Sequence, residues 1–274
     1  MITFAETMNM ATESRIDWIS LSDNYRKYKT GFVLSGGFIK GFAHLGAMQA
    51  LLEHDIRPQI ISSTSAGSLV GVLYADGNEP YQVLEFFDGL KFTDLTKPVL
   101  PTTGFFELKE LEDFLKSHLK RKRIELLPVP MVIIATDLDH GKSVHFRQGD
   151  IAQCVAASCC LPVLFSPITI DDTHYVDGGV LMNLPVSPIR EECERIYAIN
   201  VSPMLTSDYK LNIISIAERS YQFIFRSNTV AERQMADVLI EPVNLSGYSN
   251  MDLERAKEIF MIGYDTAKET IANL

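Results

Sequence analysis

The chain contains no uninterrupted apolar run of about 18 residues, the length that a transmembrane helix needs. Its first residues also lack a basic stretch followed by an apolar one, which is the pattern of a secretory signal. These two absences predict a protein without a transmembrane segment that resides in the cytoplasm.

Basic residues are also few. Lys and Arg number 25 against 35 Asp and Glu, which gives a formal net charge of −10. Nucleic-acid binding requires clustered Lys and Arg to neutralise phosphates, so the charge argues against a nucleic-acid partner. The same charge argues against simple electrostatic adhesion to anionic lipid, but it leaves hydrophobic contact with a membrane or micelle surface open.

Cysteine is scarce as well. The four cysteines are Cys154, Cys159, Cys160 and Cys193, and three of them crowd into one short segment. That spacing is a poor disulfide framework, so we expect buried free thiols in a reducing compartment. A chain of 274 residues, 46% of them hydrophobic, can bury a sizeable core without disulfides or a metal.

Short apolar strands alternate with helical patterns, which predicts an α/β layered fold. The expected strands are 31–35, 59–63, 131–136, 143–146, 165–170 and 195–201, and the expected helices are 41–54, 69–74, 211–237 and 252–272. We predict a single domain over 1–274, with an N-terminal arm at 1–29, a helical insertion at 80–127 and C-terminal helices over 211–274. The phenylalanines of the insertion suit a lid over an acyl groove or plain core, and the helix at 211–237 suits core or a homodimer face.

A candidate nucleophile lies where a predicted strand gives way to a predicted helix. The segment Ser63-Thr64-Ser65-Ala66-Gly67 places Ser65 at that turn, with small residues at Ser63, Ala66 and Gly67. A nucleophile elbow needs this context, because the strand and helix backbones pass close together below the serine. The pattern alone also fits a serine that caps the following helix.

A glycine-containing loop precedes the first predicted helix, in the segment Ser35–Gly41. Gly36 and Gly37 allow close approach of the backbone to a ligand, and a helix N-terminus adds positive partial charge. Such N–H groups could receive the oxyanion that forms when an alkoxide attacks an ester. The alternatives are a tight strand-to-helix turn and a phosphate loop, but the spacing of the nucleotide-binding glycine motifs is absent.

Histidine does not fill the role of general base easily. Six histidines occur, and none follows His174, whereas an α/β-hydrolase triad carries its histidine late in the chain. Asp177, directly before Gly178 and Gly179, is the alternative base, because a partly buried carboxylate can accept a serine proton. On its own, this segment also fits an ordinary Asp-Gly turn.

Taken in order, these segments resemble the patatin-like phospholipases over roughly residues 30–200. The resemblance also includes Gly41–Gly46 and the block from Ala157 to Pro167. It implies a three-layer α/β/α fold with a mostly parallel central sheet, and hydrolysis of fatty acyl esters of lysophospholipids, phospholipids or glycerides. It implies a Ser65–Asp177 dyad that works without histidine, metal or cofactor, with the oxyanion hole on Gly36, Gly37 and Phe38.

Lys40 ends the glycine loop and suits contact with a head-group phosphate or solvation at the rim. Two positions depart from the family pattern: Ser63 replaces the first elbow glycine and Phe38 replaces the third loop glycine. If position 38 requires a positive φ, phenylalanine costs on the order of 1 kcal/mol there and tilts an N–H donor. The alternative function is therefore a lipid- or acyl-binding protein whose catalysis is impaired at Phe38.

Overall fold

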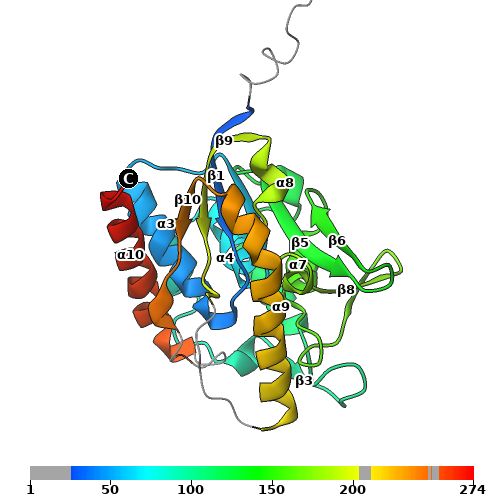
Figure 1. The fold of residues 1–274 in the computed structure, drawn as a ribbon. Coiled ribbons are helices and arrows are strands. Elements are labelled where there is room, and N and C mark those ends of the chain that lie inside the picture. The colour runs from blue at the N-terminus through cyan, green and yellow to red at the C-terminus, as the bar shows by residue number, and fades with distance from the viewer. Residues whose placement is uncertain (1–25, 204–210, 246–247, 249–252) are drawn as a thin grey trace, which may run out of the picture.

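The computed structural model describes residues 26–203, 211–245, 248 and 253–274 (Figure 1). Most of the predicted N-terminal arm lies outside these residues. The first described strand begins at Tyr28, three residues before the expected start, so the last part of the arm belongs to the sheet.

Eight strands form the main sheet, in the order β10-β9-β1-β2-β5-β8-β7, with β6 also paired to β5. These strands are β1 (Tyr28–Leu34), β2 (Ile60–Thr64), β5 (Met131–Asp137), β6 (Lys142–Phe146), β7 (Ile168–Ile170), β8 (Thr173–Asp177), β9 (Cys193–Ile199) and β10 (Val238–Ile240). The run from β10 to β5 is parallel throughout, whereas β6, β7 and β8 pair in the antiparallel sense. The mixed, mostly parallel sheet confirms the predicted fold class.

Helices cover both faces of this sheet (Figure 1). They are α3 (Phe42–Glu53), α4 (Ala66–Ala75), α5 (Pro80–Glu85), α6 (Lys109–His118), α7 (Ile151–Cys159), α8 (Ser187–Arg190), α9 (Ile213–Met235) and α10 (Ala256–Ala272). α3 and α10 lie against each other so closely that a Cβ on Gly46 would meet the Phe260 carbonyl oxygen at 1.8 Å. No helix among the described residues is long and apolar enough to cross a membrane.

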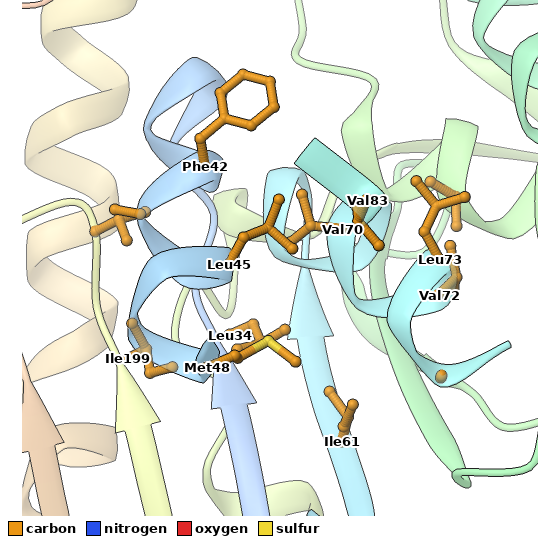
Figure 2. Close-up of a cluster of buried hydrophobic side chains, with 14 of the residues drawn as sticks. Leu34, Phe42, Leu45, Met48, Ile61, Val70, Val72, Leu73, Val83 and Ile199 are labelled. Atoms are coloured by element: carbon orange, nitrogen blue, oxygen red, sulfur yellow. The ribbon is translucent and has the colours of Figure 1, made fainter. Parts of the chain in front are cut away.

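The strand residues alternate between two hydrophobic clusters, as the period of a strand requires. Phe32 and Leu34 point to the larger cluster, which α3, α4, α6, α7 and α10 cover; Figure 2 shows the part of it between β1, β2, α3 and α4. Val33, between them, points to a smaller cluster with Leu184 and Ile189, on the face covered by α8 and the end of α9. Because both faces are packed, β2 and β5 are buried at every position.

The insertion differs in detail from the prediction. It contains the helices α5 and α6, as expected, but also a two-stranded ladder of β3 (Lys97–Pro98) and β4 (Phe106–Glu107) that was not predicted. α7, α8 and β10 were not predicted either. α7 is buried at almost every position, so it shows no polar stripe from which a helical period could be read.

The sheet places two distant segments end to end on one edge of β5. β2 and β6 both pair with Ile133 and Ile134, so they lie on opposite edges of β5. β6 and β8 likewise both pair with Ala135, so β8 shares the edge of β2. β2 ends with Thr64 beside Ile134, and β8 ends with Asp177 beside Ala135. The carboxyl ends of the two strands therefore meet, although Thr64 and Asp177 are far apart in sequence.

Candidate active site

Ser65 occupies the sharp turn between β2 and α4 that an elbow requires. Its φ is 51° and its ψ is −122°, in a region that residues with a side chain rarely adopt. Such strain persists only where the surroundings enforce it, and it is frequent at active sites. The helix crosses β1 closely, since a Cβ on Gly67 would lie 2.5 Å from the Leu34 carbonyl oxygen. A small residue is therefore needed at position 67.

A chain of serine hydroxyl groups fixes this turn. The Ser65 N–H donates to the Ser158 hydroxyl at 2.8 Å, and that hydroxyl also bonds the Ser68 hydroxyl at 3.0 Å. Ser68 in turn bonds the Ser63 hydroxyl at 3.1 Å. Ser63 is fully buried, but its hydroxyl also reaches the Val132 carbonyl oxygen at 3.3 Å. The serine that replaces the first elbow glycine is therefore accommodated by its hydrogen bonds.

Asp177, at the end of β8, lies beside the Ser65 hydroxyl at the same pocket. Its carboxylate accepts the Gly179 N–H at 2.7 Å. The residue is only 2% exposed, and burial raises its pKa from 3.8 to about 7, while the Ser65 hydroxyl and the Gly179 N–H pull the pKa down. The structure thus brings together the two residues that the sequence singled out, and gives Asp177 a pKa suited to a general base near neutral pH.

The glycine loop lies beside Ser65, but not all of its N–H groups are free. The Gly36 N–H donates to the Asn183 carbonyl oxygen at 3.1 Å, so it is not available to an oxyanion in this conformation. A Cβ on Gly36 would lie 3.3 Å from the Ser65 Cβ, which shows how near the loop passes. Among the described residues, no acceptor receives the N–H of Gly37 or Phe38. Those two groups are the stronger candidates for oxyanion donors.

Phe38 adopts the left-handed conformation of the glycine that it replaces. Its φ is 54°, so the strain expected from the sequence is present and the backbone path of the loop is kept. The loop is held from below by His44, whose ring bonds the Ser35 carbonyl oxygen at 2.8 Å. Burial lowers the pKa of His44 to about 4, so this histidine stays neutral and belongs to the core, as predicted.

An apolar pocket opens over Ser65 and Asp177. Its further lining residues are Phe38, Ile39, Ala66, Phe92, Leu95, Thr96, Leu108, Leu111, Cys159, Leu161, Phe165 and Leu253. The insertion supplies five of these side chains, from Phe92 to Leu111, and so forms one wall of the pocket. A movement of the insertion as a lid remains a prediction.

Three further residues need separate mention. Lys40 is half-buried, its pKa is lowered by burial, and it is not among the pocket-lining residues described. Cys159 lines the same pocket as Ser65, and burial together with the nearby Asp177 charge raises the pKa of its thiol well above the usual range. All four cysteines are free, as expected. In the described part of the chain, no three His, Cys, Asp or Glu side chains cluster so as to hold a metal.

Sequence patterns did not indicate the roles of three residues that support the site. These are Ser158, Asn183 and Asn228. Asn228, on α9, accepts the Asn183 N–H at 3.0 Å and donates to the Gly179 carbonyl oxygen at 2.8 Å. Asn183 thereby ties the glycine loop to the loop that follows Asp177. Only its position six residues after Asp177 could have drawn attention to it.

Comparisons with known proteins agree with this arrangement. Among curated proteins, an uncharacterized NTE family protein of Mycobacterium bovis is 31% identical over 167 residues, covering 59% of this chain and 45% of its own. The lysophospholipase NTE1 of Kluyveromyces lactis is 26% identical over 94% of this chain, which spans only 20% of that protein. The uncharacterized protein YqhO of Bacillus subtilis is 26% identical, with 84% of this chain and 93% of its own length covered.

The crystal structure of VipD from Legionella pneumophila has the same fold, with a TM-score of 0.59 at 17% identity over 90% of this chain and 67% of that one. The family model described as patatin-like phospholipase matches residues 32–189, which is more than half of the chain and includes Ser65 and Asp177. This chain therefore belongs to the patatin-like phospholipase family.

Proposed function

We propose that this chain hydrolyses fatty acyl esters of lipids through an acyl-enzyme on Ser65, with Asp177 as its general base. The observation that carries the proposal is the position of the buried Asp177 carboxyl beside the strained Ser65 at one apolar pocket. The apolar lining suits an acyl chain, and the strained elbow presents the hydroxyl at the carboxyl ends of the strands.

In the first half of the reaction, the Ser65 oxygen bonds to the ester carbonyl carbon as its proton passes to Asp177. The resulting oxyanion is received by the N–H groups of Gly37 and Phe38. When the carbon–oxygen bond to the alcohol breaks, the alkoxide takes the proton back from Asp177 and leaves. The acyl group is then held as an ester on Ser65.

In the second half, a water attacks the acyl carbon and gives its proton to Asp177. The Ser65 oxygen then leaves as the acyl-enzyme ester breaks, and it recovers that proton. Asp177 must be ionised to accept a proton in each half, so kcat/KM should rise with pH through about 7. Lysophospholipid is the first substrate to test, in view of the name of the Kluyveromyces lactis relative.

A histidine base and an impaired binding protein were the alternatives. No histidine is among the described residues that line the pocket, and His44 is bonded to the Ser35 carbonyl oxygen. The left-handed φ of Phe38 keeps the loop in the path that a glycine would take. Both observations support hydrolysis by the dyad over the alternatives.

The test uses a fluorophosphonate probe and the release of fatty acid from lysophosphatidylcholine. The wild type should be labelled and active, and Ser65→Ala should lose both. Ser62→Ala is a matched control, because Ser62 lies three residues earlier in β2 with a buried hydroxyl that bonds no other described residue. Labelling of Ser65→Ala at the wild-type level would rule out Ser65 as the nucleophile.

A further inference from the structure

We infer that one rim of the pocket docks onto an electrically neutral lipid surface. The docking itself does not depend on the proposed function, and only its biological purpose rests on that function. The docking rim consists of four exposed aliphatic side chains from three segments of the chain. They are Leu100 (84% exposed), Val163 (41%), Ile213 (71%) and Ile216 (47%). None of the four lines the pocket itself.

Val163 connects the docking rim to the pocket. The segment that contains it also supplies Leu161 and Phe165 to the pocket lining. Val163 has a φ of 71°, which is a severe outlier for a β-branched residue, and its side chain is partly exposed. Strain of this kind costs on the order of 1–3 kcal/mol and is characteristic of functional segments. A backbone held at this cost presents an apolar side chain to solvent beside the pocket.

The other two segments converge on Val163. The Phe105 N–H reaches the Val163 carbonyl oxygen at 3.3 Å. The Phe105 carbonyl oxygen accepts the Val99 N–H at 3.0 Å, across the turn that carries Leu100. On the other side, Val163 shares a small surface hollow with Ala217 and Tyr221 of α9.

α9 extends from the site to the docking rim. The Phe225 ring lies so close to Gly179 that a Cβ there would meet it at 2.7 Å. Burial, and to a lesser degree the Asp177 charge, raises the pKa of Tyr221. The middle of the helix therefore lies near the dyad, and its first turn, with Ile213 and Ile216, belongs to the docking rim. Figure 1 shows this N-terminal end of α9 and the β3 segment at the same end of the molecule, below the carboxyl ends of the strands.

The geometry favours a lipid surface over a second copy of this chain. Val163 lies between Leu161 and Phe165, which line the pocket, so a second copy seated on the docking rim would crowd the path that an acyl ester must take. Exposed aliphatic residues from separate segments around an apolar opening suit insertion into an acyl boundary. The net charge of −10 selects neutral head groups, because an anionic surface would repel the chain.

The test measures binding to vesicles of ether-linked phosphatidylcholine, which an esterase cannot cleave. The double variant Ile213→Asp/Ile216→Asp should lower the vesicle partition coefficient at least about tenfold, because two aliphatic contacts are replaced by charges. Val163→Gly should also lower it while raising stability, since glycine relieves the strained φ; this variant separates docking from misfolding. Leu126→Asp is the matched control, because Leu126 is 60% exposed but precedes the amino end of β5, away from the carboxyl ends of the parallel strands.

Turnover of the soluble ester p-nitrophenyl butyrate separates docking from catalysis. All variants should retain it, while hydrolysis of vesicle-borne lipid falls in step with binding. Loss of binding in the rim variants, in a protein that cleaves no ester at all, would support docking and refute the proposed function.

Three results would overturn the docking inference whatever the catalytic outcome. The first is wild-type binding by the double variant. The second is stronger binding to anionic than to neutral vesicles that salt abolishes, which would indicate a basic site. The third is a wild type that sediments as a dimer while the double variant sediments as a monomer, which would make the rim an interface between copies.

Discussion

Replacement of Asp177 by Asn should abolish hydrolysis and, near neutral pH, make the protein more stable. Asparagine has nearly the shape of the protonated acid, and its oxygen can still accept the Gly179 N–H. It carries no charge, so it avoids the cost of an ionised carboxylate at a position that is 2% exposed.

The size of the effect follows from the pKa of Asp177, which burial raises from 3.8 to about 7. A shift of about three units corresponds to about 4 kcal/mol between the two protonation states. Because the pKa is raised in the folded state, the stability associated with the neutral acid is fully present below about pH 4. It is lost progressively as the pH rises, and the loss is complete above about pH 7.

The assay is urea unfolding of wild type and Asp177→Asn at about pH 5 and about pH 8. The advantage of the variant should widen by about 2–3 kcal/mol between these two conditions, because most of the ionisation cost develops there. The exposed Asp172, in the turn between β7 and β8, provides the same substitution as a control. A difference between Asp177→Asn and wild type that does not change with pH would refute the argument that a buried, titrating carboxylate lies at this position.

Three further substitutions test the surroundings of the site. Phe38→Gly should raise the free energy of unfolding by about 1 kcal/mol, because it relieves the left-handed strain. It should keep kcat but raise KM for long-chain esters, because the ring that lines the pocket is lost. A tenfold fall in kcat would contradict this. Ser158→Ala should cost about 1–3 kcal/mol in urea unfolding, because the Ser65 N–H loses its acceptor. Gly46→Ala should lower the thermal midpoint by several degrees, since its Cβ would meet the Phe260 carbonyl oxygen at 1.8 Å; an unchanged midpoint would disprove the close helix contact.

Local sequence patterns sufficed for the segments that carry the chemistry. Ser65 lies in the strand-to-helix turn that its small neighbours indicated, and Asp177 ends a strand before two glycines. α3 begins and ends within one residue of the predicted range, because Phe42, Leu45 and Met48 recur at a helical period.

Features that depend on distant partners could not be predicted from the sequence. Gly36 was expected to supply an oxyanion donor, but the Asn183 carbonyl oxygen occupies its N–H, a contact that no local pattern encodes. Ser158 lies on α7, whose burial on all sides removes the amphipathic period that would have revealed the helix. β10 has only three residues and follows directly on a long helix, so it is too short for an alternation of side chains to be recognised.

The meeting of β2 and β8 on one edge of β5 makes the alignment of Ser65 and Asp177 an all-or-none property. Strand registers change in whole residues, each about 3.3 Å along the strand, and a slip of one residue turns every side chain to the opposite face. A one-residue slip of β8 would therefore remove Asp177 from Ser65 entirely rather than lengthen the distance between them by a fraction. Substitutions on β5 should accordingly divide into those that leave the catalytic rate nearly intact and those that eliminate it, with few intermediate values.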